Sequence, residues 1–267
     1  DGGNLLAGTS NSNTGSNVDA LIVKTNPAGQ GMWTKTYGGA GADIFNKIIK
    51  TSDGNYLAVG AGSFKLGHAS DVFIVKIDGQ GNIIWSKAYG LGTLYGEVGR
   101  SVVETPDGGF AIAADYNNND ATVQPLYMKV DKNGTLLWSK LFGIPGTGHA
   151  YDLVSQGDVL IVTGVVAKAS VYTSLNNGYI IKLNNSNGAL LWTRNIESRG
   201  RSNNLHQVKI WGNELLFTMY NSENYTSGDC APYYFRTDTS GNPVLMASLT
   251  FTGLNRQFLN MYTNVIP

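Results

Sequence analysis

The sequence predicts an all-β fold built from a repeated unit of four antiparallel strands, and three observations predict it. A polar turn followed by an apolar strand recurs in nearly the same letters, as DGQGNIIWSKAYG at 78–90 and DKNGTLLWSKLFG at 131–143. Short runs of β-branched and aromatic residues alternate with Gly, Asn and Asp, which is typical of strands and tight turns. No stretch combines helical periodicity with helix caps.

The tryptophans set the period of the repeat. Trp33, Trp85, Trp138 and Trp192 follow one another at intervals of about 50 residues, and Met246 stands where a fifth would be. Four-stranded units that repeat at this period are typical of the blades of a β-propeller. The sequence therefore predicts a five-bladed β-propeller.

Each unit is expected to hold four strands, named A to D in chain order. Strand A is a short apolar run such as 44–50, and strand B follows a turn that contains Asp-Gly, as in TSDGNYLAVG at 51–60. Strand C is an apolar run that ends in a base, and strand D follows a second turn and carries the tryptophan. The bases that end strand C are Lys24, Lys76, Lys129, Lys182 and Arg236.

The two ends of the chain read as complementary halves of one unit. Residues 1–10 read as a strand B without a strand A, and 259–267 read as a strand A without a strand B. We therefore expect the last strand to complete the first blade and close the ring, which leaves no free sheet edge there. The expected single domain covers 1–267, with blades at 1–39 plus 254–267, 40–90, 91–143, 144–197 and 198–253.

Composition limits the classes of function. Acidic and basic residues balance at 19 each, and the resulting net charge of zero disfavours nucleic acid and anionic membrane surfaces as partners. No apolar run is long enough for a membrane span. The single cysteine, Cys230, excludes an internal disulfide. A charged fraction of 14%, with abundant Gly, Asn and Ser, favours an exported protein, located outside the cell or on its surface.

The motifs TSDGNYLAVG at 51–60 and DVFIVKIDGQGNIIWSKAYG at 71–90 resemble a repeat of exported β-propeller proteins that are common in Bacteroidetes-type bacteria and in some archaea. The resemblance covers nearly the whole chain; it is specific over 41–143 and degraded over 195–267. It implies a secreted or surface-attached protein, often a module of a larger adhesin-like protein. Few such proteins have an assigned activity, so the resemblance implies architecture and location more than chemistry.

The residues that recur at the same place in several units are interpreted as scaffold. Trp85, Lys87 and Tyr89 share one face of strand D, but equivalent residues recur in other units at the same place. We therefore expect them to pack between neighbouring blades, with the lysine stem over the ring. The aspartates of the turns, in D-x-x-G at 78–81, 131–134 and 238–241 and in Asp-Gly at 53–54 and 107–108, are expected to accept backbone hydrogen bonds, while Gly supplies the positive φ. They are Asp53, Asp78, Asp107, Asp131 and Asp238.

Candidate binding residues lie where the units differ. In a propeller the D–A and B–C connections emerge at the same ends of the strands, and here these connections are long and varied; we call this end the loop-rich face. Loops on a rigid scaffold commonly carry binding, and aromatic rings with Asn, Asp and Arg suit a glycan or a surface protein. The candidates are Tyr95, Glu97, Arg100, Asp115, Tyr116, His149, Tyr151, Arg201, His206, Tyr220 and Tyr225.

Three functions are compatible with these patterns. The first is a noncatalytic extracellular binding or adhesion module, and the second is a structural spacer of a larger surface protein. The third is a glycoside hydrolase, which needs two carboxylates about 5–10 Å apart; Glu97 and Asp43 occupy equivalent strand starts, with Asp152 nearby. No cofactor is expected, because zinc-ligand spacings are absent and D-x-x-G turns lack the dense oxygen ligands of a calcium loop, which makes calcium a weak alternative.

Overall fold

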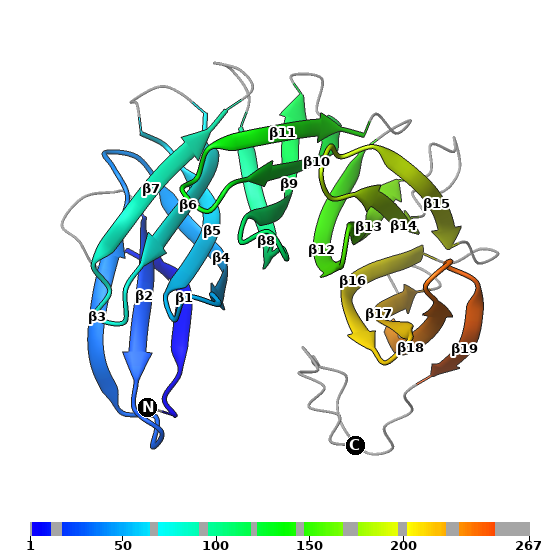
Figure 1. Cartoon of the computed structure of the whole chain (residues 1–267), viewed down its shortest axis with the longest axis horizontal. Helices are drawn as coiled ribbons and strands as arrows, with labels where there is room; N and C mark the ends of the chain where they lie inside the picture. The colour runs from blue at the N-terminus through cyan, green and yellow to red at the C-terminus, as the bar shows by residue number, and fades with distance from the viewer. Residues whose placement is uncertain are drawn as a thin grey trace.

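The computed structural model describes residues 2–11, 18–64, 69–90, 96–118, 122–142, 147–167, 176–196, 202–222 and 230–248. This part of the chain is all-β, and it contains no helix that could cross a membrane. Its strands form five separate antiparallel sheets that follow one another around an arc (Figure 1). The five sheets agree with the five blades that the repeat predicts.

The first sheet has three strands: β1 (Leu5–Ser10), β2 (Asp19–Thr25) and β3 (Gly31–Tyr37). The second has β4 (Asp43–Lys50), β5 (Tyr56–Gly62), β6 (Asp71–Ile77) and β7 (Ile83–Tyr89). The third has β8 (Glu97–Glu104), β9 (Phe110–Asn118), β10 (Thr122–Val130) and β11 (Leu136–Leu141). The fourth has β12 (Gly148–Gln156), β13 (Val159–Ala167), β14 (Asn176–Asn184) and β15 (Leu190–Ile196). The fifth has β16 (Ser202–Trp211), β17 (Glu214–Ser222), β18 (Cys230–Asp238) and β19 (Pro243–Ser248).

Every four-stranded sheet is a simple meander in chain order, as the A-to-D unit predicts. The strand A of each, namely β4, β8, β12 and β16, lies on the inner side of the arc, and β7, β11, β15 and β19 lie on its outer side (Figure 1). Consecutive inner strands contact one another. The segment 254–267, which is expected to supply the strand A of the first sheet, lies outside the described residues.

The D-x-x-G turns behave as predicted. Oδ1 of Asp78 accepts hydrogen bonds from the backbone N–H groups of Gln80 and Asn82 at 2.9 and 2.8 Å, and Gly81 has a φ of 77°. Asp53 has a second role that the sequence reading missed, because its Oδ2 lies 2.6 Å from Nζ of Lys76. The base that ends strand C is thus neutralised by the A–B turn of its own blade.

The tryptophan of strand D in one blade packs against the C–D turn of the next blade. Nε1 of Trp138 donates to the carbonyl of Asn185 at 3.0 Å, and its ring covers Gly188 in the same C–D turn. Nε1 of Trp85 donates to the carbonyl of Lys132 at 3.1 Å in the equivalent way. The predicted packing role of the recurring tryptophan is therefore confirmed. The ring-to-turn pairs are Trp33 on Gly81, Trp85 on Gly134, Trp138 on Gly188 and Trp192 on Gly241.

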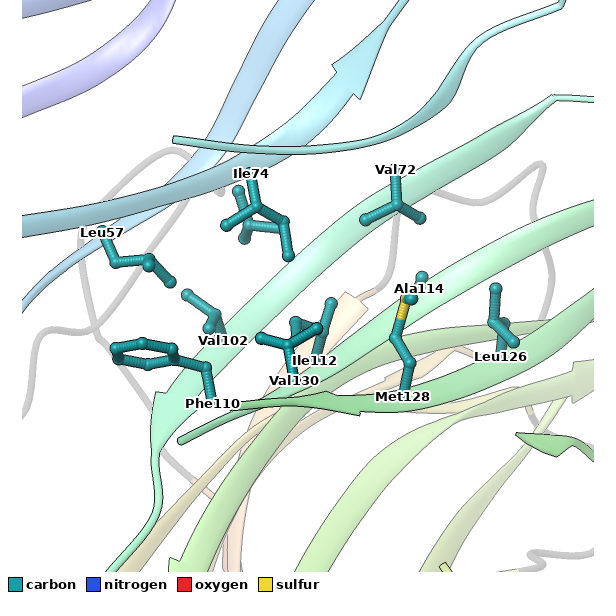
Figure 2. Close-up of a cluster of buried hydrophobic side chains, with 11 residues drawn as sticks. Leu57, Val72, Ile74, Val102, Phe110, Ile112, Ala114, Leu126, Met128 and Val130 are labelled. Carbon is teal, nitrogen blue, oxygen red and sulfur yellow. The ribbon is translucent and has the colours of Figure 1, made fainter. Parts of the chain in front are cut away.

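Apolar side chains fill the space between neighbouring sheets. Figure 2 shows one such cluster, in which Leu57 and Ile74 of the second sheet face Val102 and Ile112 of the third. These side chains are at most 1% exposed. Each sheet therefore presents one apolar face to each neighbour, which is why the strands B and C read as nearly continuous apolar runs.

Gly188→Ala is predicted to destabilise the protein more than Gly54→Ala. Both glycines have positive φ values, 69° and 83°, so alanine costs about 1 kcal/mol of backbone strain at either position. A Cβ at position 188 would also lie 2.7 Å from Cε3 of Trp138, whereas a Cβ at position 54 would meet nothing within 4 Å. Crowding should add about 1–3 kcal/mol, measured as the free energy of unfolding in urea. Equal losses in the two variants would contradict the ring-to-turn packing.

Candidate functional site

The four inner strands share a local irregularity. In each, the pairing register with the adjacent strand shifts by one residue, as at a β-bulge, at the fourth or fifth residue of the strand. A bulge re-aims one side chain, and bulges are frequent beside functional sites. The extra residues, one per four-stranded sheet, are Asn46, Arg100, Tyr151 and His206.

The carboxylate of Asp115 is the buried centre of the site. Its side chain is 4% exposed and comes from β9. Oδ2 accepts from Nε of Arg100 at 2.9 Å and from Nδ1 of His149 at 2.8 Å, and Oδ1 accepts from the backbone N–H of Ala150 at 2.9 Å. One carboxylate therefore ties the third sheet to the fourth and fixes two side chains that reach the surface.

A row of rings continues from this cluster across the fourth and fifth sheets. The rings of His149 and Tyr151 are nearly parallel, with centroids 6.1 Å apart and an interplanar angle of 4°. Tyr151 stacks on His206 at 4.6 Å and 7°, and His206 meets Tyr220 edge to face at 4.9 Å. We call His149, Tyr151, His206 and Tyr220 the ring row. All four were predicted as binding residues, and the fold brings them into one continuous line.

Two buried tyrosines fix the backbone beside the ring row. The hydroxyl of Tyr179 donates to the backbone carbonyl of His149 at 2.9 Å, and it lies 2.8 Å from the hydroxyl of Tyr127. Burial raises the pKa of both phenols above the ordinary value for tyrosine. They therefore stay neutral, and they hold the backbone of β12 in place by hydrogen bonding.

A second polar cluster joins the inner strands near the middle of the arc. Nζ of Lys47 in β4 lies 2.7 Å from Oδ1 of Asp152 in β12 and donates to Oγ of Ser101 at 2.7 Å. Ser101 itself donates to the same carboxylate oxygen at 2.6 Å, and Oδ2 accepts from the backbone N–H of Val208 at 3.2 Å. This cluster links all four inner strands.

Glu97 and Asp43 do not reach the surface. Both are 0% exposed, at equivalent starts of β8 and β4. Their backbone N–H groups donate to the carbonyls of Ser70 and Val18, both at 2.7 Å, so each joins the beginning of strand A to the preceding blade. Burial is the main reason why the pKa of Asp43 is raised. In this arrangement neither carboxylate is placed to touch a sugar, and Asp152 is held by Lys47.

The remaining candidates are placed as follows. Tyr116 is half-buried, pairs with Glu97 across β8 and β9, and packs against the apolar cluster of Figure 2 rather than joining the ring row. Tyr95, Arg201 and Tyr225 lie outside the described residues. Sequence reasoning missed Asn46, Lys47 and Ser101. A break in the two-residue alternation of strand A was the signal that could have pointed to these positions.

No three metal-ligating side chains lie together in the part of the chain that the structure describes. The turn carboxylates that make calcium conceivable already accept backbone hydrogen bonds, as at Asp131, whose Oδ1 takes the N–H groups of Asn133 and Thr135. What the site offers is a fixed guanidinium, ring edges with nitrogen and oxygen atoms, and a buried carboxylate that orients them. This is a set of groups for recognising a polar ligand.

No family model matches the chain, and no curated protein matches its sequence. Among solved structures, a Hadza microbial sialidase aligns with a TM-score of 0.53 at 11% identity, covering 87% of this chain and 53% of that one. A variant of the NanB sialidase from Streptococcus pneumoniae aligns at 0.52 and 10%, covering 76% and 32%. The extracellular domains 1–2 of Drosophila Semaphorin 1b align at 0.50 and 5%, covering 84% and 49%.

At these identities the likeness shows the fold alone, and that fold is the β-propeller. The chain spans about half or less of the length of each of these structures. The class of protein is therefore settled by the five antiparallel sheets and by these neighbours, while the identity of the ligand has to be argued from the site.

His206 predicts a pH dependence of stability. Burial lowers its pKa, so the folded protein takes up this proton less readily than the unfolded chain, where imidazole has a pKa of about 6.5. The contribution of the neutral His206 ring to the free energy of unfolding is fully present above pH 6.5. It declines as the pH falls below 6.5, because the unfolded chain is then protonated more readily than the folded protein. His206→Gln should lose less stability than the wild type between pH 7.5 and pH 5.5 in urea unfolding. An identical loss in both proteins would contradict the burial of this imidazole.

Proposed function

We propose that this propeller is a noncatalytic extracellular binding module that takes a glycan on its loop-rich face. The observation that carries the proposal is the ring row, His149, Tyr151, His206 and Tyr220, beside the buried carboxylate of Asp115. The row lies near the loop-rich ends of the inner strands and is partly exposed. It is held by hydrogen bonds and stacking before any ligand arrives, which lowers the entropic cost of binding.

The geometry of the row favours a hydroxyl-rich ligand over an apolar one. Because Tyr151 and His206 stack on each other, their faces are largely occupied, and their edges carry the phenol and the ring nitrogens. Such edges alternate hydrogen-bonding atoms with aromatic carbon, which suits the alternating hydroxyl and C–H groups of a sugar. Loops of variable length around a rigid ring suit selection among related glycans.

Export is supported by composition and by the resemblance of the repeat to exported bacterial propellers. The chain has few charges and one cysteine. One structural neighbour is an extracellular portion of Semaphorin 1b, which is consistent with this location. A secreted or surface-attached binding module accounts for a varied face on a repetitive scaffold more directly than a spacer does.

We also propose that residues 254–267 complete the first sheet as its inner strand and close the ring into one domain. Among the described residues the first sheet has three strands where the others have four, and its three strands correspond to B, C and D of the repeat. Deletion of 254–267 should lower the melting temperature by 10 °C or more, on the order expected for the loss of several kcal/mol. Deletion of residues 170–173, between β13 and β14 in the sequence, is a matched control and should cost far less. An unchanged melting temperature on removal of 254–267 would disprove closure by this segment.

The ligand class is tested by a broad glycan array, screened with and without calcium. Wild-type protein should give a specific hit that Tyr151→Ala weakens at least about tenfold, a loss of about 1.4 kcal/mol. Trp211→Ala is the control, because Trp211 is a 48% exposed aromatic residue at the opposite end of the inner strand β16. Thermal melting establishes that both variants are folded.

A blank array in both conditions would count against a glycan ligand and would favour a structural spacer or a protein partner. A hit that Trp211→Ala removes and Tyr151→Ala does not would place the binding site at the opposite end of the inner strands. That result would contradict binding on the loop-rich face.

A further inference from the structure

Two groups of ion pairs differ in which member is exposed to solvent, the base or the acid. In the pairs of the inner strands the base is accessible and the acid is buried: Arg100 is 37% exposed and Asp115 is 4% exposed. Lys47 and Asp152 follow the same order, at 30% and 8%. In the pairs of the A–B turns the order is reversed, since the carboxylate of Asp53 is 47% exposed and its lysine partner is 8% exposed.

The accessible ends of the inner-strand ion pairs are positive, and those of the A–B turn pairs are negative. A second turn pair has the same order, because Asp107 is 53% exposed while Lys129 is 1% exposed, whereas Glu214 and Arg236 of the fifth sheet are almost equally exposed, at 25% and 23%. At the Arg100–Asp115 pair, which holds His149 of the ring row, the accessible group is therefore a cation that an anionic ligand can contact.

Arg100 is the accessible cation nearest to the ring row, because it shares the carboxylate of Asp115 with His149. Its Nε and Nη2 atoms both lie against Oδ2 of Asp115, at 2.9 and 2.8 Å, so the plane of the guanidinium is fixed. Its other terminal nitrogen, Nη1, has no partner among the residues that the structure describes. A fixed guanidinium with unused N–H groups is well suited to a carboxylate.

His149 supplies the complementary chemistry. Because Nδ1 faces the carboxylate of Asp115 at 2.8 Å, the neutral ring carries its proton on Nδ1. Nε2 is then an acceptor, on a side chain that is 33% exposed. An acceptor of this kind takes the proton of a hydroxyl group. The carboxylate of Asp115 thus orients Arg100 for binding an anionic group and His149 for binding a hydroxyl group.

We infer that the ligand is an acidic saccharide, whose carboxylate binds Nη1 of Arg100 and whose neighbouring hydroxyl donates to Nε2 of His149. The chain of sugars then extends along Tyr151 and His206. Three of these contact residues, Arg100, Tyr151 and His206, are bulge residues that differ from blade to blade, so the bulge positions select the ligand. This inference rests on the proposed glycan-binding function and narrows it to carboxylate-bearing sugars.

Calorimetric titration with three matched probes tests the inference: trigalacturonic acid, its methyl ester and neutral galactotriose. The free acid should bind wild-type protein at least about tenfold more tightly than the ester, because only the acid carries the charge that Arg100 recognises. Raising the salt concentration should weaken the binding of the acid and leave the ester unaffected.

Arg100→Gln should abolish the difference between acid and ester, and Arg100→Lys should restore part of it, because lysine keeps the charge but lacks the planar guanidinium. Arg194→Gln is the matched control. Arg194 is an exposed arginine on the outer strand β15, where it lies over the ring of Trp192, and its replacement changes the net charge equally. This control should bind the acid as the wild type does.

Equal affinity of wild-type protein for all three probes would overturn the acidic-saccharide inference and leave the glycan-binding proposal standing. No binding of any probe, together with a blank glycan array, would overturn both. If Arg100→Gln fails to fold, the comparison of acid with ester on wild-type protein still decides the question.

Discussion

The contact on which the rest of the structure depends is the tryptophan ring of one blade lying on the glycine of the next blade's C–D turn. The ring needs a backbone with no Cβ beneath it, and the turn needs a residue with positive φ; Gly188 meets both needs under Trp138. The indole N–H also donates to a turn carbonyl. Because the contact is repeated at the four junctions between successive blades, a chain of similar units packs in one direction around an arc.

Repetition of the scaffold leaves the inner strands free to differ. At the bulge positions the four sheets present Asn, Arg, Tyr and His, whereas the tryptophan of strand D recurs in four of the five units. The polar clusters around Asp115 and Asp152 cross from blade to blade, so they contribute to assembly as well as to the surface above them. One carboxylate can therefore serve as a structural tie and as the group that orients a binding site.

Much of the fold was predictable because its chemistry is local. Asp78 and Gly81 form their turn with neighbours in sequence, and the apolar runs read directly as strands. The site was predictable only as a set of candidates. That Arg100, Asp115 and His149 share one oxygen depends on how β8, β9 and β12 meet, which no local pattern encodes. Lys47 was missed for the same reason, since its partner Asp152 lies two blades away.

The central claim is that one set of repeated positions, the tryptophans and C–D turns, holds the blades together, while another set, the bulge positions of the inner strands, binds the ligand. Backbone NMR during titration with trigalacturonic acid tests this claim most directly. The account predicts that amide shifts on titration concentrate at the loop-rich ends of β8, β12 and β16, around Arg100, His149 and His206. The amides of the C–D turns, such as those of Gly134 and Gly188, should stay unchanged. Shifts that concentrate in those turns would contradict the account, because the residues assigned to holding the blades together would then be the ones that bind.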